Sequence, residues 1–248
     1  MPPISTDALV LRTYKVGETS KVVVLLTRER GKLRAVAKGA RGARPRYQSS
    51  LEPLSEVRVG LYGRQGAELY RLGECELVRS AFPAGTLGLD AVLALSYFAE
   101  LLDAFAQEGE AEDAVYRLAV ATLAAVAAGR ETDVLSRYLE AWLLKLHGIY
   151  PPLDRCSGCD GPLAAGERRY HRPAHGFVCA SCGSASGPVL DTSDHEFLRE
   201  AFARPPAGLA RCPSAGLEAF HRELIRSHLE RDLHSHRVLR DVARETRG

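Results

Sequence analysis

The sequence predicts an α+β protein of several domains, with a β-rich N-terminal part followed by helices and a cysteine-rich segment. Three observations predict this arrangement. Residues 1–80 hold short runs of Val, Leu and Tyr, residues 81–150 repeat apolar side chains at helical spacing, and residues 153–190 interrupt both patterns with Cys, Gly, Pro and Ser. With 248 residues and 46% apolar content, the chain can form more than one domain and bury a sizeable core.

The β-rich part is expected to form a small barrel. Its candidate strands are residues 8–14, 21–27, 32–38, 55–62 and 67–78, with turns at 28–31 and 63–66. Gly31 can supply the positive φ that the first turn needs. Five short strands in this length favour a closed or nearly closed five-stranded β-barrel of the OB type, and an SH3-like barrel fits almost as well.

Helices are expected in two later segments. Residues 81–150 contain three amphipathic stretches, at 87–105, 115–125 and 135–146, which predict a helical bundle, with Thr132 as the N-cap of the third helix. Ser193 and Glu196 have the spacing of a capping box, and a final long helix is expected from about Leu217 towards Arg244. The expected domains are the barrel (1–80), the bundle (81–150), the cysteine-rich segment (151–190) and C-terminal helices packing with the bundle (191–248).

Charge is distributed unevenly along the chain. Residues 1–80 have fifteen basic and eight acidic side chains (net +7), residues 81–150 have four and ten (net −6), and residues 151–248 have fourteen and thirteen (net +1). Within residues 28–48, only Glu29 opposes eight basic residues. This clustering favours a polyanion-binding site, and a solvated charged surface is the alternative. The acidic segment 81–150 could meet a basic partner, but ordinary packing as a bundle is the favoured interpretation.

The basic stretch is suited to phosphate. Alternation along the third candidate strand turns its basic residues to one face and its apolar residues to the other. The arginines of the following loop lie among glycines, so side chains and backbone N–H groups can both reach phosphate oxygens. Tyr47 is the best stacking candidate, and stacking is expected to be minor beside charge. The residues expected to contact nucleic acid are Arg12, Lys32, Arg34, Lys38, Arg41, Arg44, Arg46 and Tyr47.

The cysteine pattern is the most specific chemical signal in the chain. Cys156 and Cys159 form one C-x₂-C pair, and Cys179 and Cys182 form a second after nineteen residues. Two such pairs predict one tetrahedral Zn²⁺ site, and four thiolates leave no position for a catalytic water, so the zinc is expected to be structural. His171 and His175 lie between the pairs and could replace a cysteine, but ordinary surface roles are favoured. Cys75 and Cys212 are expected to be a strand residue and a loop residue without a chemical role.

The N-terminal residues show no secretory signal, and no apolar run there is long enough to span a membrane, so we expect a cytoplasmic protein with reduced cysteines.

Nucleophile and base residues do not form a recognisable catalytic set. A protein that binds nucleic acid is therefore the leading hypothesis. The alternatives are an RNA-binding or ribosome-associated barrel with a zinc ribbon and, least favoured, a zinc hydrolase.

The segment ALVLRTYKVGETSKVVVLLTRERGKLRAVAKGAR (8–41) resembles the opening of the RecO family of bacterial DNA repair proteins. The family pattern corresponds here to Arg12 and Tyr14, Glu18 and Ser20, Thr27 and Gly31, and Ala37 to Arg41. Residues 49–59 continue the likeness, and the helical block, the cysteine segment and residues 224–239 follow in the family's order. The resemblance is specific in the first sixty residues and looser in the bundle.

This resemblance implies an N-terminal OB fold, a helical domain and a zinc-binding segment in a protein that is not an enzyme. It implies binding to single- and double-stranded DNA and annealing of complementary strands. It also implies work with RecR, and with RecF in many cases, to load RecA onto strands covered by single-strand DNA-binding protein. The expected location is the cytoplasm, in association with the nucleoid.

Overall fold

A computed structural model describes residues 4–42, 47–64, 66–82, 87–163, 166, 168–183 and 187–245. The chain groups into two compact units, Met1–Ala127 with Leu233–Gly248, and Ala128–Asp232. This grouping divides the expected bundle between its second and third helices, and the segment 191–248 contributes to both units. Each unit contains its own set of buried apolar residues.

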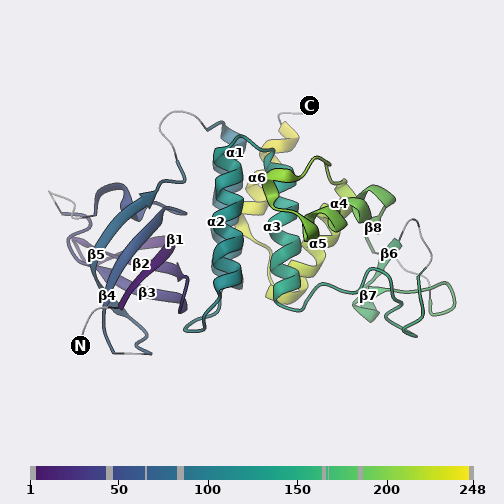
Figure 1. Ribbon diagram of the computed structural model, residues 1–248, viewed down its shortest axis with the longest axis horizontal. Helices are drawn as coiled ribbons and strands as arrows, with labels where there is room; N and C mark the ends of the chain where they lie inside the picture. The colour runs from purple at the N-terminus through teal and green to yellow at the C-terminus, as the bar shows by residue number, and fades with distance from the viewer. Residues whose placement is uncertain are drawn as a thin grey trace. The chain divides into compact units, whose positions relative to one another are not determined.

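The first unit contains a closed barrel with the strand order β1-β2-β3-β5-β4 (Figure 1). Its strands are β1 (Ile4–Val16), β2 (Ser20–Thr27), β3 (Gly31–Ala37), β4 (Glu56–Tyr62) and β5 (Tyr70–Arg79), and a short 3₁₀ helix (Gln48–Leu51) lies between β3 and β4. β1 pairs with both β2 and β4, and a short parallel pairing of β3 with β5 completes the closure. The expected five-stranded OB-type barrel is confirmed.

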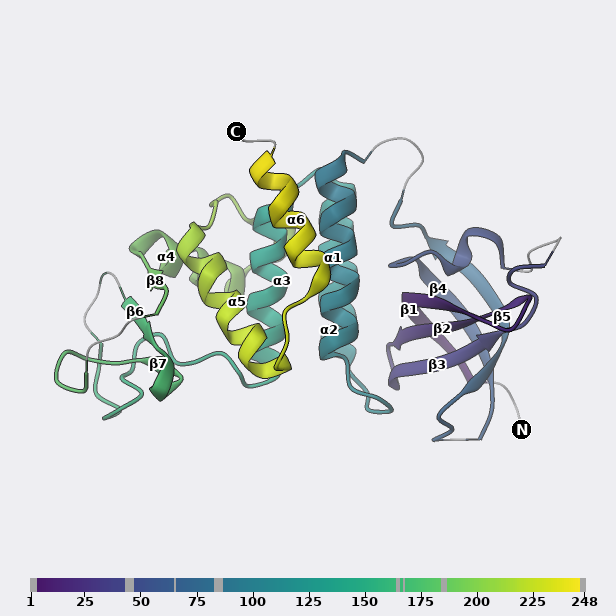
Figure 2. The ribbon, with the colours of Figure 1, turned by 180° about the vertical axis from the view of Figure 1, so that it is seen from behind.

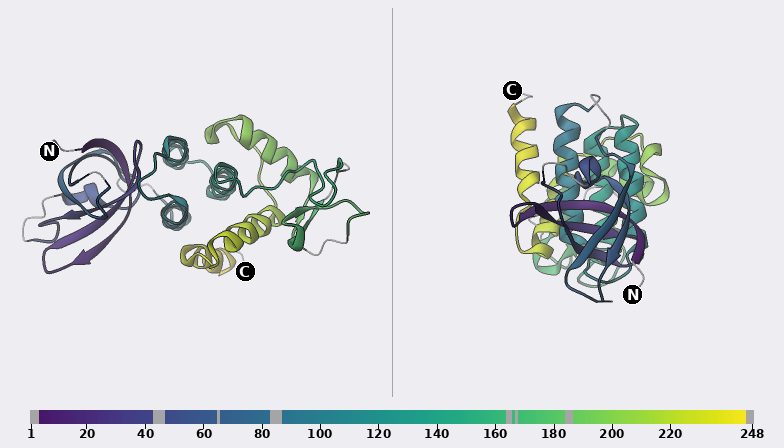
Figure 3. Two further views of the ribbon diagram at one scale, coloured as in Figure 1. Left: turned by 90° about the horizontal axis from the view of Figure 1, so that it is seen from below. Right: turned by 90° about the vertical axis from the view of Figure 1, so that its left-hand side faces the viewer.

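Period-2 alternation builds this barrel. Ala8 and Val10 of β1, together with Val23 of β2, are fully buried in the barrel core. β1 has a bulge between Val10 and Arg12, and it pairs with β2 on one side and with β4 on the other. Figure 3 shows the strands of the barrel curving around their common interior. The residues that alternate with these core positions turn to the outer face of the barrel.

Three helices complete the first unit: α1 (Leu89–Phe105), α2 (Asp113–Ala127) and α6 (His234–Glu245). α1 contacts β1, and α6 lies against α1 (Figure 2). The Glu100 carboxylate of α1 accepts hydrogen bonds from the backbone N–H groups of His234 (3.0 Å) and Ser235 (2.7 Å). These are N-terminal groups of α6 that its own turns leave unsatisfied, so Glu100 caps the helix and fixes the end of the chain in this unit.

The second unit contains α3 (Thr132–Leu146), α4 (Thr192–Ala203), α5 (Ala215–Leu229) and a small sheet with the order β7-β6-β8. Those strands are β6 (Arg168–His171), β7 (Gly176–Phe177) and β8 (Val189–Leu190), and two short 3₁₀ helices span Arg172–Ala174 and Pro206–Gly208. α5 packs against α3 and β8, and α4 packs against α3.

Three expectations about helix ends are wrong. α3 is preceded by Glu131 as its N-cap, and Thr132 is already its first residue. The capping box of α4 uses Asp191 and Asp194 instead of Ser193 and Glu196, because the Asp191 carboxylate accepts the backbone N–H of Asp194. The expected long final helix is two helices, since Glu230 adopts a left-handed conformation that ends α5.

The second unit buries a polar network between α3 and α5. The carboxylate of Glu140 is 3.0 Å from Nδ1 of His221 and 2.7 Å from Nη2 of Arg137, and the hydroxyl of Tyr150 is 3.0 Å from Nε2 of His221. His221 is fully buried. Burial disfavours the charged imidazolium and lowers the pKa of His221, against the opposing effect of Glu140.

Within the described ranges, no helix combines the length and apolar character that a membrane crossing requires.

Candidate nucleic-acid interface and metal centre

Arg12 and the basic residues of 28–48 are called the basic strip, and part of this strip is paired with acidic groups of the chain's own helical segment. Nζ of Lys32 donates a hydrogen bond to the backbone carbonyl of Asp103 (2.8 Å) and lies 3.7 Å from its carboxylate. Nε of Arg12 approaches the same carboxylate at 3.0 Å. The Lys32 side chain is only 14% exposed, so little of its charge faces solvent. Lys32 and Arg12 thus hold the end of α1 against the barrel.

Two more arginines of the strip meet carboxylates that follow α1. Arg34 pairs with Glu108, and Nε of Arg28 donates to Oδ1 of Asp113 at 2.7 Å. This hydrogen bond raises the pKa of Arg28 and lowers that of Asp113. The backbone is joined as well, because the N–H of Lys32 donates to the carbonyl of Gln107 (2.8 Å). The acidic segment, for which packing as a bundle was the favoured interpretation and a basic partner the alternative, thus pairs with the basic strip of the same chain.

The described basic side chains at the C-terminal end of the strip are exposed to solvent. Lys38 follows β3 directly and is exposed. Arg41 is exposed too, and its loop is held by the bond from its backbone N–H to the carbonyl of Thr19 (2.8 Å). In the part of the chain that the structure describes, neither side chain has an ion-pair partner. Arg44 and Arg46 lie outside the described residues.

The stacking role expected of Tyr47 is contradicted. Tyr47 is 5% exposed, and its hydroxyl donates to the backbone carbonyl of Leu72 at 2.9 Å. It directly precedes the 3₁₀ helix before β4 and belongs to the barrel core, together with Leu51. Its ring therefore lies in the barrel core and presents no face to a base.

A pocket of about 410 Å³ lies where β3 and β5 separate. Three cations line it, Arg30, Lys32 and Arg34, but so do the carboxylates of Glu68 and Glu108. Its charge is therefore mixed, and two of its cations already have acidic partners. The exposed cations after β3 are better placed for a polyanion than this pocket.

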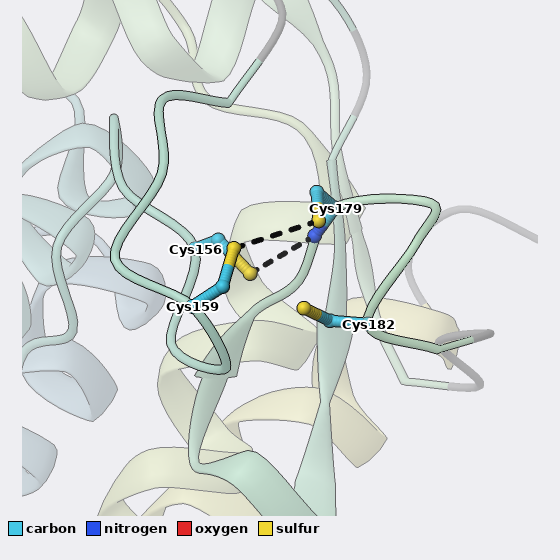
Figure 4. A group of neighbouring side chains, drawn as sticks. All are labelled: Cys156, Cys159, Cys179 and Cys182. Atoms are coloured by element: carbon cyan, nitrogen blue, oxygen red, sulfur yellow. Dashed lines mark hydrogen bonds between the residues drawn. The ribbon is translucent and has the colours of Figure 1, made fainter.

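The four cysteines of the two C-x₂-C pairs converge in the second unit. Their sulfur atoms lie within 4.8 Å of one another, and no other such cluster occurs among the described residues (Figure 4). Sγ of Cys159 is 3.9 Å from Sγ of Cys179. Four thiolates around one Zn²⁺ with bonds of about 2.3 Å would be about 3.8 Å apart. The separations therefore fit a tetrahedral metal site.

Glycines make room for the sulfur atoms. A Cβ on Gly158 would lie 3.2 Å from Sγ of Cys182, and a Cβ on Gly161 would lie 3.3 Å from Sγ of Cys159. Gly183 has a φ of +146°, which other residues rarely adopt. Any side chain at these positions would crowd or strain the turns around the cluster, so the two loops are shaped as a cradle for four thiolates.

The four thiols of the cluster influence one another's ionisation. Hydrogen bonds from backbone N–H groups, chiefly that of Cys179 (3.2 Å), lower the pKa of Cys156 to about 6. Interactions with the neighbouring thiols, Cys159 first, raise the pKa of Cys182 to about 12. One thiol therefore ionises at the expense of another, and a bound metal ion is what allows all four to be thiolates. With four protein ligands the coordination is complete, so the site suits a structural role.

The remaining cysteines lie apart from this centre. Cys75 is in β5, where burial raises the pKa of its thiol to about 11 and makes it unreactive. Cys212 is exposed. Nδ1 of His171 accepts the backbone N–H of Ala174 at 3.2 Å, a capping role. Among the described residues, the one group that could hold a metal ion consists of the four cysteines of the C-x₂-C pairs.

A closed OB-type barrel, a helical part and a cluster of four cysteines that could bind a metal define a class of multidomain proteins built around an OB barrel. Two family models narrow this class: "Recombination protein O N terminal" matches residues 1–81, and "Recombination protein O C terminal" matches residues 87–237. The chain therefore belongs to the RecO family of DNA repair and recombination proteins.

Several relatives support this membership. The DNA repair protein RecO of Koribacter versatilis is 33% identical over 234 residues, which cover 92% of this chain and 94% of the relative. Those of Anaeromyxobacter sp. (strain K) and Pelotomaculum thermopropionicum are 32% and 33% identical, each over 94% of this chain and 92% of the relative. The similarity thus extends over both units.

Proposed function

We propose that this protein is a recombination mediator that binds single- and double-stranded DNA through the cationic end of its barrel. The observation that carries the proposal is the pair of exposed cations after β3, Lys38 and Arg41, which have no acidic partner among the described residues. Arg44 and Arg46 continue the same charge along the sequence. Contacts of this kind read the phosphate backbone and not the bases, so binding would be indifferent to sequence and sensitive to salt.

Annealing would follow from the same charges. Cationic side chains screen the repulsion between two phosphate backbones, so complementary strands can approach while their bases pair. In this proposal the protein acts by binding and not by catalysis. It works at the nucleoid in the cytoplasm with RecR, and with RecF, to load RecA onto strands covered by single-strand DNA-binding protein. Family membership is the support for these partners.

We further propose that the four-cysteine site holds one Zn²⁺ ion through Cys156, Cys159, Cys179 and Cys182. Bound there, the ion supplies a cross-link between two loops and no reaction chemistry. Thiolate ligands and tetrahedral spacing support zinc over harder ions such as Mg²⁺.

The test of DNA binding is a salt titration with a charge-matched control. Replacing Lys38 and Arg41 with glutamine should weaken binding to single strands and duplex alike and slow annealing. If both side chains contact phosphates, the slope of log K against log salt should fall in magnitude by about 1.4 on single strands and about 1.8 on duplex. An unchanged slope with unchanged annealing would refute the assignment of these residues.

The control is the double variant Arg58→Gln, Arg117→Gln. Both arginines are exposed and belong to the same unit, but each is paired with an aspartate, Asp7 at 3.1 Å and Asp113 at 2.7 Å. The net charge changes by the same amount, and the slope should stay as in the unchanged protein. Competition between RNA and DNA of equal sequence tests the alternative, since a strong preference for RNA would point to recognition of the 2′-hydroxyl.

A further inference from the structure

One row of side chains crosses the outer face of the barrel at the end where Lys38 and Arg41 lie, two cations without an acidic partner in the described part of the chain. Strand register places five residues side by side, because Tyr14 pairs with Val22, Val22 with Val36, Val36 with Arg71, and Arg71 with Tyr62. Directly paired residues point to the same face of a sheet. The row therefore extends over all five strands, from β1 through β2, β3 and β5 to β4.

The row faces outward. The residues beside it in the sequence lie in the barrel core: Val23, Ala35, Ala37, Leu61, Tyr70 and Leu72. Alternation then sends the row to the outside. Its two ends are aromatic and accessible, since Tyr14 is 45% exposed and Tyr62 is 36% exposed. Val22 is buried and Val36 is half-buried, so the middle of the row is apolar and only partly exposed.

Tyr62 lies on a surface shaped to receive its ring. A Cβ on Gly73 would be 2.2 Å from Cε2 of Tyr62, so the ring occupies space that any side chain at Gly73 would need. The guanidinium carbon of Arg71 lies 5.1 Å from the ring centroid, within range of a cation–π contact. Gly73 and Arg71 thus hold the ring in one orientation while part of it stays open to solvent.

We propose that Tyr14 and Tyr62 are stacking platforms for the unpaired bases of single-stranded DNA. Lys38 lies two positions beyond Val36 in the sequence and Arg41 follows it, so cations border the row on the side of the loop. Single-strand binders combine such a cationic track with aromatic faces on which bases stack. Bases paired inside a duplex offer no exposed face, so the row would favour single strands. This proposal rests on the proposed DNA binding and adds preference for unpaired bases.

The experiment compares DNA with and without bases. Affinities of the full chain are measured for an oligo-dT and for an abasic oligomer of the same length, with the unchanged protein, Tyr14→Leu and Tyr62→Leu. We expect the unchanged protein to prefer oligo-dT, and each leucine variant to lose about 5-fold to 150-fold in affinity for oligo-dT. Affinities for the abasic oligomer and for duplex should not change, nor should the salt slope.

Tyr14→Phe and Tyr62→Phe are the matched controls, because they keep the ring and remove only the hydroxyl. They should bind oligo-dT nearly as well as the unchanged protein, and thermal unfolding of every variant checks the fold. Equal affinity of the unchanged protein for oligo-dT and the abasic oligomer would overturn the stacking proposal and leave phosphate binding intact. Absence of binding to any oligomer would instead overturn the proposed function itself.

Discussion

With Zn²⁺ at the proposed four-cysteine site, loss of one ligand should unfold the loop 153–163 and leave its neighbours in place. In Cys179→Ser the metal loses one of four thiolates, and we expect metal content to drop well below one ion per chain. The loop 153–163 is then left with four backbone hydrogen bonds: those donated by Cys156, Ser157, Asp160 and Leu163. Such bonds contribute about 1 kcal/mol each, whereas ordering these residues costs about 1 kcal/mol or more per residue.

The shortfall of several kcal/mol is what a structural zinc ion supplies, at about 10–16 kcal/mol in small zinc-binding peptides. The unfolding should stop at the hairpin of β6 and β7. Tyr170 and Phe177 are buried there, with ring centroids 5.2 and 5.3 Å from that of Phe220 in α5. This aromatic packing does not depend on the metal.

The assay is limited proteolysis with trypsin, together with metal analysis. Arg155 is exposed and precedes Cys156, and its side chain is held by Asp160 at 2.7 Å. Opening of the loop removes this restraint, so we expect rapid cleavage after Arg155. Cys212→Ser is the matched control, since Cys212 is an exposed cysteine outside the cluster. It should keep the metal and the original cleavage rate. A Cys179→Ser protein with one tightly held ion and unchanged cleavage would refute the reasoning.

Three further predictions follow from charge. Arg34→Gln should leave the salt slope of DNA binding unchanged, because Glu108 already occupies that guanidinium; a loss equal to that of the Lys38 and Arg41 variant would contradict this. Asp103→Asn should lower the free energy of unfolding by about 1–2 kcal/mol in a denaturant titration, since Lys32 keeps a poorly solvated charge with a weaker partner; unchanged stability would contradict it. Burial lowers the pKa of His221, so below about pH 6.5 the unfolded state binds more protons than the folded state. Stability should therefore be level above pH 6.5 and fall by at most about 1.4 kcal/mol at pH 5.5, and His221→Gln should reduce that fall.

The barrel and the cysteine pattern of the candidate metal site were predictable because their signals are local. Each strand carries its own period-2 pattern, and alternation decides which residues enter the core without knowledge of the partner strand. The four cysteines likewise specify their chemistry by spacing, since two C-x₂-C pairs can enclose one ion in many different folds. Gly31 also behaves as its turn requires, with a φ of +60°.

Pairings between distant segments were not predictable in the same way. Nothing near Lys32 or Arg34 in the sequence indicates that Asp103 and Glu108 would meet them, because that contact depends on how α1 packs against the barrel. Tyr47 was misjudged for a related reason. Its neighbours in sequence are basic, but its position before the 3₁₀ helix turns the ring inward.

The row that ends in Tyr14 and Tyr62 depends on register across five strands, which the alternation of one strand cannot give. The two tyrosines are 48 residues apart in the sequence, and only closure of the barrel places them on one row. Similarly, α6 belongs to the first unit, where it packs on α1 and is capped by Glu100, and these contacts join residues far apart in the chain.

The central claim is that DNA binds at the end of the barrel where Lys38 and Arg41 are exposed. The most direct test is photo-crosslinking of a bound single-stranded oligonucleotide to the full chain, followed by mapping of the crosslinked peptides. The account predicts crosslinks in the peptides that contain Tyr14, Lys38 and Arg41, and their loss when unlabelled DNA competes. Crosslinks confined to residues 128–232, with none in the barrel, would contradict it.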